Sequence, residues 1–428
     1  MTDQISAQPG GATHRPSHRV SDFNRLWLGQ SISQLGSQVT TLALPLTAVL
    51  YLKATPGQIG LLAAVRAFAF AGLMLFFGVL VDRRRRRAVM ITSDLGRAAV
   101  TLAVPMLAWA GTLSMADLYT AAFLLGALLA VFSLAYRAYL PTLVSSEVLL
   151  AANSRLQGTE SLSDVAGPGL AGLLIQLSGA PFAMIADAAS FVVSAASVIA
   201  IRAPEPAVVP RPPSGDGFLR TVYSDIRVGL AVIFRHPVLR LVAAASGVFN
   251  VFATIMLTIF LLYAARTARM SPGQIGLVFA GFGVGGMIAA AILSRAMKAG
   301  LGRLLAIGYL IGAVVIAALP LVRGTPAIQT ACFSVLFLVA GCAIVSANIV
   351  EMTIWQAATP SQLQGRVAAG FYFLTAALTP LAALAAGELG GLIGLHATLI
   401  VAAAGIPASL PWIMAPRIRR LRTLDDLS

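Results

Sequence analysis

The stretch Thr55-Pro56-Gly57-Gln58-Ile59-Gly60-Leu61 decides the fold, because it recurs as Ser271-Pro272-Gly273-Gln274-Ile275-Gly276-Leu277. In both copies a hydroxyl residue and a proline precede the same five residues, and the copies lie 216 positions apart. A spacing of about half the 428-residue chain indicates an internal duplication. Each copy begins a long apolar segment, so we expect the repeated unit to be a group of membrane-spanning helices.

The composition of the chain is that of a protein embedded in a bilayer. Hydrophobic residues make up 58% of the sequence, charged residues 11%, and the mean hydropathy is +0.86. A membrane core about 30 Å thick requires roughly 20 apolar residues per helix. About twelve such segments are present, at 26–52, 57–81, 88–110, 116–135, 156–177, 181–201, 239–263, 272–293, 304–322, 328–350, 367–386 and 395–414. The predicted fold is therefore all-α, with twelve transmembrane helices.

Six helices in each half leave the two halves in the same orientation, as parallel repeats around a central interface. A segment rich in proline joins them and cannot form a helix interior, and an amphipathic helix is expected to follow it at 218–235. The predicted organisation is a tail (1–22), a first six-helix half (23–202), a linker with the amphipathic helix (203–237), a second half (238–414) and a second tail (415–428).

The net charge of +14 arises from basic residues placed between the apolar segments. If the N-terminus is cytoplasmic, 24 of the 30 lysines and arginines lie on the cytoplasmic side and four lie in outer loops. This bias predicts a multi-pass protein of the cell membrane with both termini in the cytoplasm. It also argues against a nucleic-acid-binding surface, because the charges do not gather on one soluble face.

The most specific motif is Gly78-Val79-Leu80-Val81-Asp82-Arg83-Arg84-Arg85-Arg86-Arg87. It resembles the Gly-x-x-x-Asp-Arg-x-x-Arg-Arg signature between the second and third helices of the major facilitator superfamily. The chain resembles most the drug:proton antiporter branch of that family, which includes macrolide and siderophore exporters. The resemblance covers about residues 23–414 and implies two six-helix halves around a central cavity.

In that family the signature acts as a conformational latch, in which the aspartate pairs with the N-terminal end of helix eleven. The resemblance assigns this role here to Gly78, Asp82, Arg83 and Arg87, although five arginines would also anchor the loop to anionic lipid. The neighbouring buried charges Asp94 and Arg97 lie three residues apart on one predicted helix and are grouped with the latch. Their spacing also allows them simply to neutralise each other.

Helix five contains Gly167, Pro168 and Gly172, which resemble the Gly-Pro element associated with export in the family. A plain packing kink is the alternative interpretation. The arginine that the family places on helix four is missing from the segment 123–135, where Gly126 stands without it. Proton transfer through such an arginine is therefore not expected.

Polar residues form a stripe on the first predicted helix, where Gln30, Gln34 and Gln38 lie four residues apart. Such a stripe is costly against lipid and suits the wall of a polar cavity. The positions 216 residues later are also polar and uncharged: Ser246, Asn250 and Thr254. We expect both stripes to line the substrate cavity, with interhelical hydrogen bonding as the alternative.

Ionisable residues inside membrane segments are costly and are therefore candidates for proton coupling. Four are singled out: Asp164, Glu160, Asp187 and Arg66. Loss of solvation favours the neutral form of a carboxylate, which allows it to carry a proton. Asp164, which lies just before the Gly-Pro element, is the first candidate.

These features predict a secondary active transporter, and not an enzyme. It would export amphipathic or apolar small molecules by alternating access, as a monomer driven by the proton gradient. No cofactor or metal is expected, because a phosphate-binding loop is missing and the four histidines lack metal-ligand spacing. The alternatives are an importer or a lipid flippase of the same fold, and a membrane enzyme or receptor, for which no cluster of reactive residues is visible.

Overall fold

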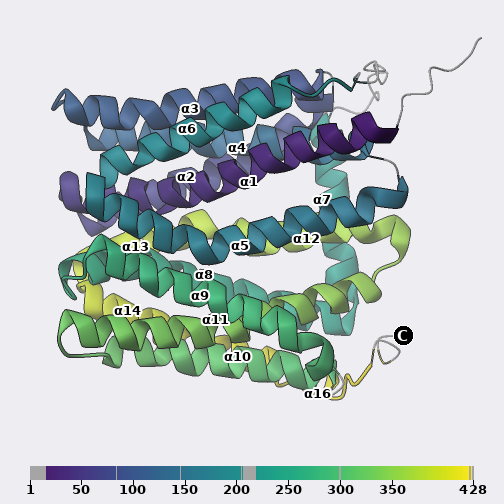
Figure 1. Cartoon of the computed structure of the whole chain (residues 1–428). Helices are drawn as coiled ribbons and strands as arrows, with labels where there is room; N and C mark the ends of the chain where they lie inside the picture. Colours follow the sequence, from purple (N-terminus) through teal and green to yellow (C-terminus); the bar gives the residue numbers. More distant parts are fainter. Residues whose placement is uncertain are drawn as a thin grey trace, which may run out of the picture.

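The computed structural model describes residues 16–82, 84–144, 146–203, 205, 218–297, 300–423 and 426. Within these residues the regular structure is entirely helical. Figure 1 shows two layers of helices that run side by side, with the first half (purple to blue) above the second half (green to yellow). The predicted all-α fold with two halves is confirmed.

The first half consists of long helices joined by short connections. Its elements are α1 (Pro16–Leu46), the π-helix η1 (Thr47–Tyr51), α2 (Pro56–Asp82), α3 (Arg86–Trp109), α4 (Met115–Leu143), α5 (Ser146–Ser178) and α6 (Ala180–Ile199). We call the end of the bundle at which α1 begins the termini end, and the end at residues 52–55 the opposite end.

The helix predicted at 218–235 forms as α7 (Phe218–Arg235) and lies across the termini end in Figure 1. It packs against α12, where Gly229 allows its backbone to approach the Arg366 carbonyl oxygen. The second half follows with α8 (Pro237–Arg266), α9 (Pro272–Ala296), α10 (Leu301–Ala318), η3 (Leu319–Leu321), α11 (Pro326–Ala357), η4 (Ser361–Leu363), α12 (Gln364–Ala376), α13 (Thr379–Leu392), α14 (Leu395–Gly405), η5 (Ile406–Ser409), α15 (Leu410–Ile413) and α16 (Pro416–Arg419).

Ten segments of the described chain are long and apolar enough to cross a membrane. The two remaining predicted spans correspond to α1 and α5, which are 31 and 33 residues long but more polar. Both pack lengthwise against other helices, α1 on α5 and α6, and α5 also on α9. On α1 several of the polar side chains, such as Gln30, Ser33 and Thr40, are buried between helices, whereas on α5 most of the polar side chains are exposed.

Two predicted helices are interrupted in the structure, and proline explains both interruptions. The segment 367–386 is divided into α12 and α13, with Pro380 in the first turn of α13. The segment 395–414 is divided into α14, η5 and α15, with Pro407 at the start of η5. Proline lacks the backbone N–H that a continuous helix needs, and it disfavours helical geometry in the residue before it.

The repeated motif explains how the two halves meet near the opposite end. A Cβ atom at Gly60 on α2 would lie 2.8 Å from the Cα of Gly387 on α13, and one at Gly276 on α9 would lie 2.8 Å from the Cα of Gly172 on α5. The two helix crossings are therefore equivalent in the duplicated structure. Only glycine permits backbones to approach this closely.

The apolar cores show which end of the bundle is closed. Near the opposite end a single core contains residues of both halves, from Leu46 and Val49 to Tyr263 and Met270. Near the termini end two separate cores are present, one formed within residues 23–201 and the other within residues 233–421. Among the described residues, the halves thus share one core at the opposite end and have separate cores at the termini end.

Candidate functional site

A cavity of about 480 Å³ lies between the two halves. Its wall is formed by α1, α2, α4 and α5 of the first half and by α8 and α9 of the second. Small-molecule sites have this size and combine an apolar wall with a few polar groups. The polar lining residues are Gln38, Thr41, Arg66 and Thr258, and the apolar ones include Phe70, Leu257, Leu261 and Phe279.

Gln38 connects this central cavity to Asp164, the first candidate proton carrier. The Gln38 Nε2 atom donates a hydrogen bond of 2.7 Å to Asp164 Oδ1. Gly167 permits the close packing of α5 on α1, because a Cβ atom there would lie 2.4 Å from Gln38 Cγ. The structure therefore brings a residue of the predicted polar stripe that lines the cavity into contact with a predicted carboxylate that is exposed on α5.

The Gly-Pro element of α5 lies at the same wall. Pro168 lines the cavity, and its carbonyl oxygen faces Gly276 of α9. Gly172, one turn later, forms the close crossing with that helix. α5 continues as one helix from Ser146 to Ser178. The contacts of α5 with α1 and α9 are therefore shaped by Gly167, Pro168 and Gly172.

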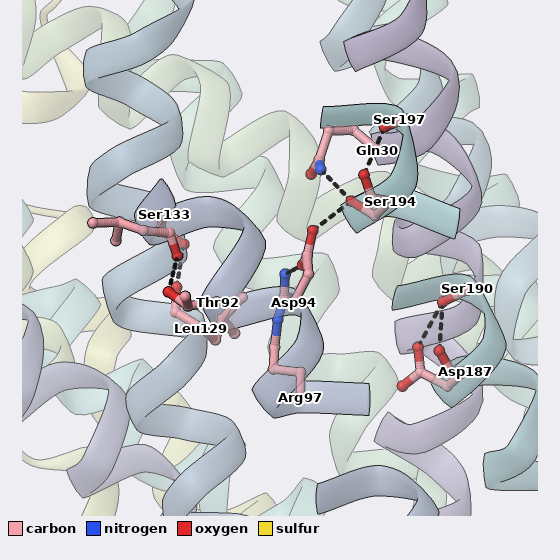
Figure 2. A network of polar contacts seen from close by, with 11 residues as sticks. Gln30, Thr92, Asp94, Arg97, Leu129, Ser133, Asp187, Ser190, Ser194 and Ser197 are labelled. Atoms are coloured by element: carbon pink, nitrogen blue, oxygen red, sulfur yellow. Dashed lines mark hydrogen bonds and ion pairs between the residues drawn. The ribbon is translucent and has the colours of Figure 1, made fainter. Parts of the chain in front are cut away.

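Arg66 brings a positive charge into the central cavity. Its Nη2 atom donates a 3.1 Å hydrogen bond to Thr41 Oγ1. Asp187, the other predicted residue, is fully buried on α6. Asp187 accepts a 3.0 Å hydrogen bond from Ser190 Oγ, as Figure 2 shows. Arg66 therefore lines the cavity, whereas Asp187 is not among the lining residues.

Figure 2 shows a second polar network inside the first half, on α1, α3 and α6. Gln30 Nε2 donates to Ser194 Oγ at 2.9 Å, and Ser194 Oγ donates to Asp94 Oδ2 at 2.7 Å. Asp94 forms an ion pair with Arg97, and both side chains are buried. The Arg97 guanidinium also lies 4.4 Å from the ring centres of both Phe132 and Phe191. Gln30 therefore makes interhelical hydrogen bonds, and Asp94 and Arg97 neutralise each other within the core.

The structure describes only some of the residues of the predicted latch. Arg83 and the side chains of the segment that includes Gly78 and Asp82 lie outside the described residues. Arg87, in the first turn of α3, donates through Nε to the Val198 carbonyl oxygen at 3.1 Å and through Nη2 to that of Ile199 at 2.6 Å. A cation is stabilised at this position because the carbonyl groups at a helix C-terminus carry partial negative charge. Arg87 thus joins α3 to α6 within the first half.

The other predicted residues lie apart from the central cavity lining. Gln34 and Thr254 are half-buried on α1 and α8, and Glu160 is exposed on α5, one turn before Asp164. Across the described residues, no three His, Cys, Asp or Glu side chains are grouped as a metal site would require.

A second cavity, of about 550 Å³, lies within the second half among α8, α10, α11 and α12. Ser246 and Asn250 line this cavity and not the central one, which corrects the predicted placement of the second polar stripe. Ser246 Oγ donates a 2.5 Å hydrogen bond to Glu351 Oε1, and Tyr309 Oη donates one of 3.3 Å to Glu351 Oε2. A carboxyl group held by two hydroxyl groups is therefore one of the polar groups of this cavity.

Glu351 is the residue that the sequence analysis missed. The predicted span ended at residue 350, so Glu351 was counted outside the membrane, whereas α11 continues to Ala357. The apolar residues on both sides of it, Val350 and Met352 with Ile354 and Trp355, were the signal for a longer helix.

Comparison with known proteins agrees with this geometry. The family model described as Major Facilitator Superfamily matches residues 26–384. The chain is 29% identical over 370 residues to the multidrug efflux pump Tap of Mycolicibacterium fortuitum, covering 82% of this chain and 84% of that protein. It is 26% identical over 186 residues to the macrolide efflux protein A of Streptococcus pyogenes, covering 43% of this chain and 45% of that protein.

Solved structures show the same fold at low identity. A bacterial homologue of the iron transporter ferroportin in its inward-facing state has a TM-score of 0.69 at 18% identity, with 92% of this chain and 98% of that chain covered. The nucleoside transporter NupG has a TM-score of 0.70 at 11% identity, with the same coverage. With two helical halves, a cavity between them and a family match over most of its length, this multi-pass membrane protein belongs to the major facilitator superfamily of transporters.

Proposed function

We propose that the chain exports amphipathic organic molecules across the cell membrane in exchange for protons, as a monomer that works by alternating access. The observation that carries the proposal is the arrangement around the central cavity. One continuous core seals the halves at the opposite end, while two separate cores leave them independent at the termini end. Alternating access requires a central site that is closed to one side while the other side is free to open.

The charge distribution supports an orientation with the termini end in the cytoplasm. The segments at that end hold 24 lysines and arginines, whereas the loops at the opposite end hold four. In this orientation the halves are separated on the cytoplasmic side, where a substrate for export has to enter. The arrangement corresponds to an inward-facing state.

The character of the central cavity supports amphipathic substrates. Its wall is mainly aliphatic and aromatic, with Gln38, Thr41 and Thr258 as hydrogen-bonding groups and Arg66 as a single charge. Such a wall suits molecules with a large apolar surface and few polar groups. The names of the similar proteins, which describe multidrug and macrolide efflux, favour the same class and the outward direction.

Asp164 is the proposed site of proton exchange. Its carboxylate accepts a hydrogen bond from Gln38, which lines the cavity on α1. Asp164 itself is on α5, the helix that contacts α9 of the other half at Gly172. Protonation removes the charge and weakens this charge-assisted hydrogen bond. A change of protonation at Asp164 therefore alters the contact between α1 and α5 at the cavity wall.

Transport into proteoliposomes tests this proposal. Substrate accumulation in vesicles with the cytoplasmic face outside should require a lumen more acidic than the medium. Asp164→Asn should still let substrate move down its own gradient but should lose the proton-driven accumulation. Glu160→Gln, one turn earlier on the same exposed helix face, is the matched variant and should retain it. Transport that is unaffected when the gradient is collapsed would contradict proton coupling. Movement only in the opposite direction would identify an importer.

A further inference from the structure

The cavity in the second half contains one carboxylate without a basic partner. In the described part of the chain, the ion pairs are Arg25 with Asp22 and Arg97 with Asp94, so Glu351 belongs to none. The hydroxyl groups of Ser246 and Tyr309 are its hydrogen-bond donors. A charge inside a membrane segment is costly unless a partner neutralises it. Glu351 is therefore suited to a countercharge supplied from outside the chain.

The wall around Glu351 is aromatic. The rings of Phe249 and Tyr309 meet edge to face with their centres 5.4 Å apart, and those of Trp355 and Phe371 are stacked at 6.0 Å. All four side chains line the cavity. The faces of aromatic rings attract cations, and several rings around one site recognise quaternary and protonated amines. The wall thus favours the same sign of charge that the carboxylate requires.

The site lies in the part of the second half between its middle and the termini end, and it shares no lining residue with the central cavity. Tyr309 is eight residues from the start of α10, about 12 Å by helical rise, and Glu351 is six residues from the end of α11. Its helices are α8, α10, α11 and α12, whereas those of the central cavity are α1, α2, α4, α5, α8 and α9. Only α8 contributes to both cavities.

We propose that this cavity is a binding site for hydrophobic organic cations, in which Glu351 supplies the countercharge and the aromatic side chains surround the apolar groups. The volume of about 550 Å³ lies in the range of sites for drug-sized molecules. Ser246 and Tyr309 hold the carboxylate against the cavity wall, and Asn250 and Asn348 provide further polar groups on its lining. The direction of transport rests on the proposed function, whereas binding of the cation does not.

Equilibrium binding to the purified full-length protein tests the site, with tetraphenylphosphonium as the cation and triphenylphosphine oxide as the neutral comparison. The wild-type protein should bind the cation at least tenfold more tightly. Glu351→Gln should weaken cation binding by about tenfold or more, which corresponds to about 1.4 kcal/mol. Binding of the neutral compound should stay unchanged, which also shows that the variant is folded. Glu388→Gln, the same change at an exposed residue on α13, should behave as wild type.

Equal affinity of the wild-type protein for the two compounds would overturn the proposal, as would Glu351→Gln with unchanged cation binding. If Glu351→Gln does not fold, Phe371→Leu is the second variant, and it should reduce cation binding more than neutral binding. An equal reduction of both would also overturn the proposal. These outcomes are independent of the proposed function, because binding needs no gradient. Export of neutral compounds without cation binding would leave that function intact and reject only this site.

Discussion

Replacing Gly276 by alanine places a methyl group in the contact between α9 and α5. The added Cβ would lie 2.4 Å from the Pro168 carbonyl oxygen and 2.8 Å from the Cα of Gly172. Ordinary contacts of this kind begin at 3.4 Å, so the helices have to separate by about 1 Å. Both neighbouring atoms belong to backbone and cannot rotate away. Overpacking costs about 1–3 kcal/mol, and here the cost falls on the state that is closed at the opposite end.

The expected result is a shift of about 5- to 150-fold in the conformational equilibrium, away from that closed state. Spin labels at Thr112 and Arg323, which are exposed on the two halves at the opposite end, report the separation by electron paramagnetic resonance. The native cysteines, Cys332 and Cys342, are replaced first.

Gly169→Ala is the matched control for this measurement. It adds the same methyl group one turn from Gly172 on the same helix, where the nearest atom is the Ala280 Cβ at an ordinary 3.9 Å. The control should retain the wild-type distance distribution, whereas Gly276→Ala should increase the population with longer distances. Identical distributions for the two variants would refute the role of the glycine crossing.

Two further predictions concern the packing of each half. Asp94→Asn should destabilise the protein by about 3–5 kcal/mol, because it leaves the buried Arg97 unpaired. Thermal unfolding measures this loss, and adding Arg97→Met should recover much of it. If the double variant is no more stable than Asp94→Asn, the unpaired charge is not the cause. Gly229→Ala should release α7 from α12, since the new Cβ would clash with the Arg366 backbone. Faster hydrogen exchange in α7 is expected, with no change for Gly365→Ala, which meets no atom within 4 Å.

The sequence predicted the helical fold well because membrane insertion imposes a simple rule. Every span needs roughly 20 apolar residues, and the backbone must satisfy its own hydrogen bonds. The duplicated motif predicted the two halves, and the structure gives its physical basis in the crossings at Gly60 and Gly276. The interruptions between α12 and α13 and at η5 were missed, although Pro380 and Pro407 were visible signals.

The candidate site was less predictable because hydropathy does not show which side of a helix a residue occupies. Gln30 and Gln38 share one stripe, yet Gln30 bonds to Ser194 in the core while Gln38 lines the central cavity. Ser246 and Asn250 occupy equivalent positions of the second half but lie in a different cavity. Local variation in packing breaks the symmetry of the duplication at the level of individual side chains.

The resemblance of its motifs implied a transporter, whereas the sequence by itself determined that this protein is a duplicated helical membrane protein, with its basic residues concentrated on one side of the membrane. Those properties follow from composition and periodicity, which act within each segment. Only the tertiary structure decided which polar side chains reach a cavity, which end of the bundle is closed, and that Glu351 lies beside Ser246 and Tyr309. These depend on contacts between helices distant in sequence, and Ser246 and Glu351 are 105 residues apart.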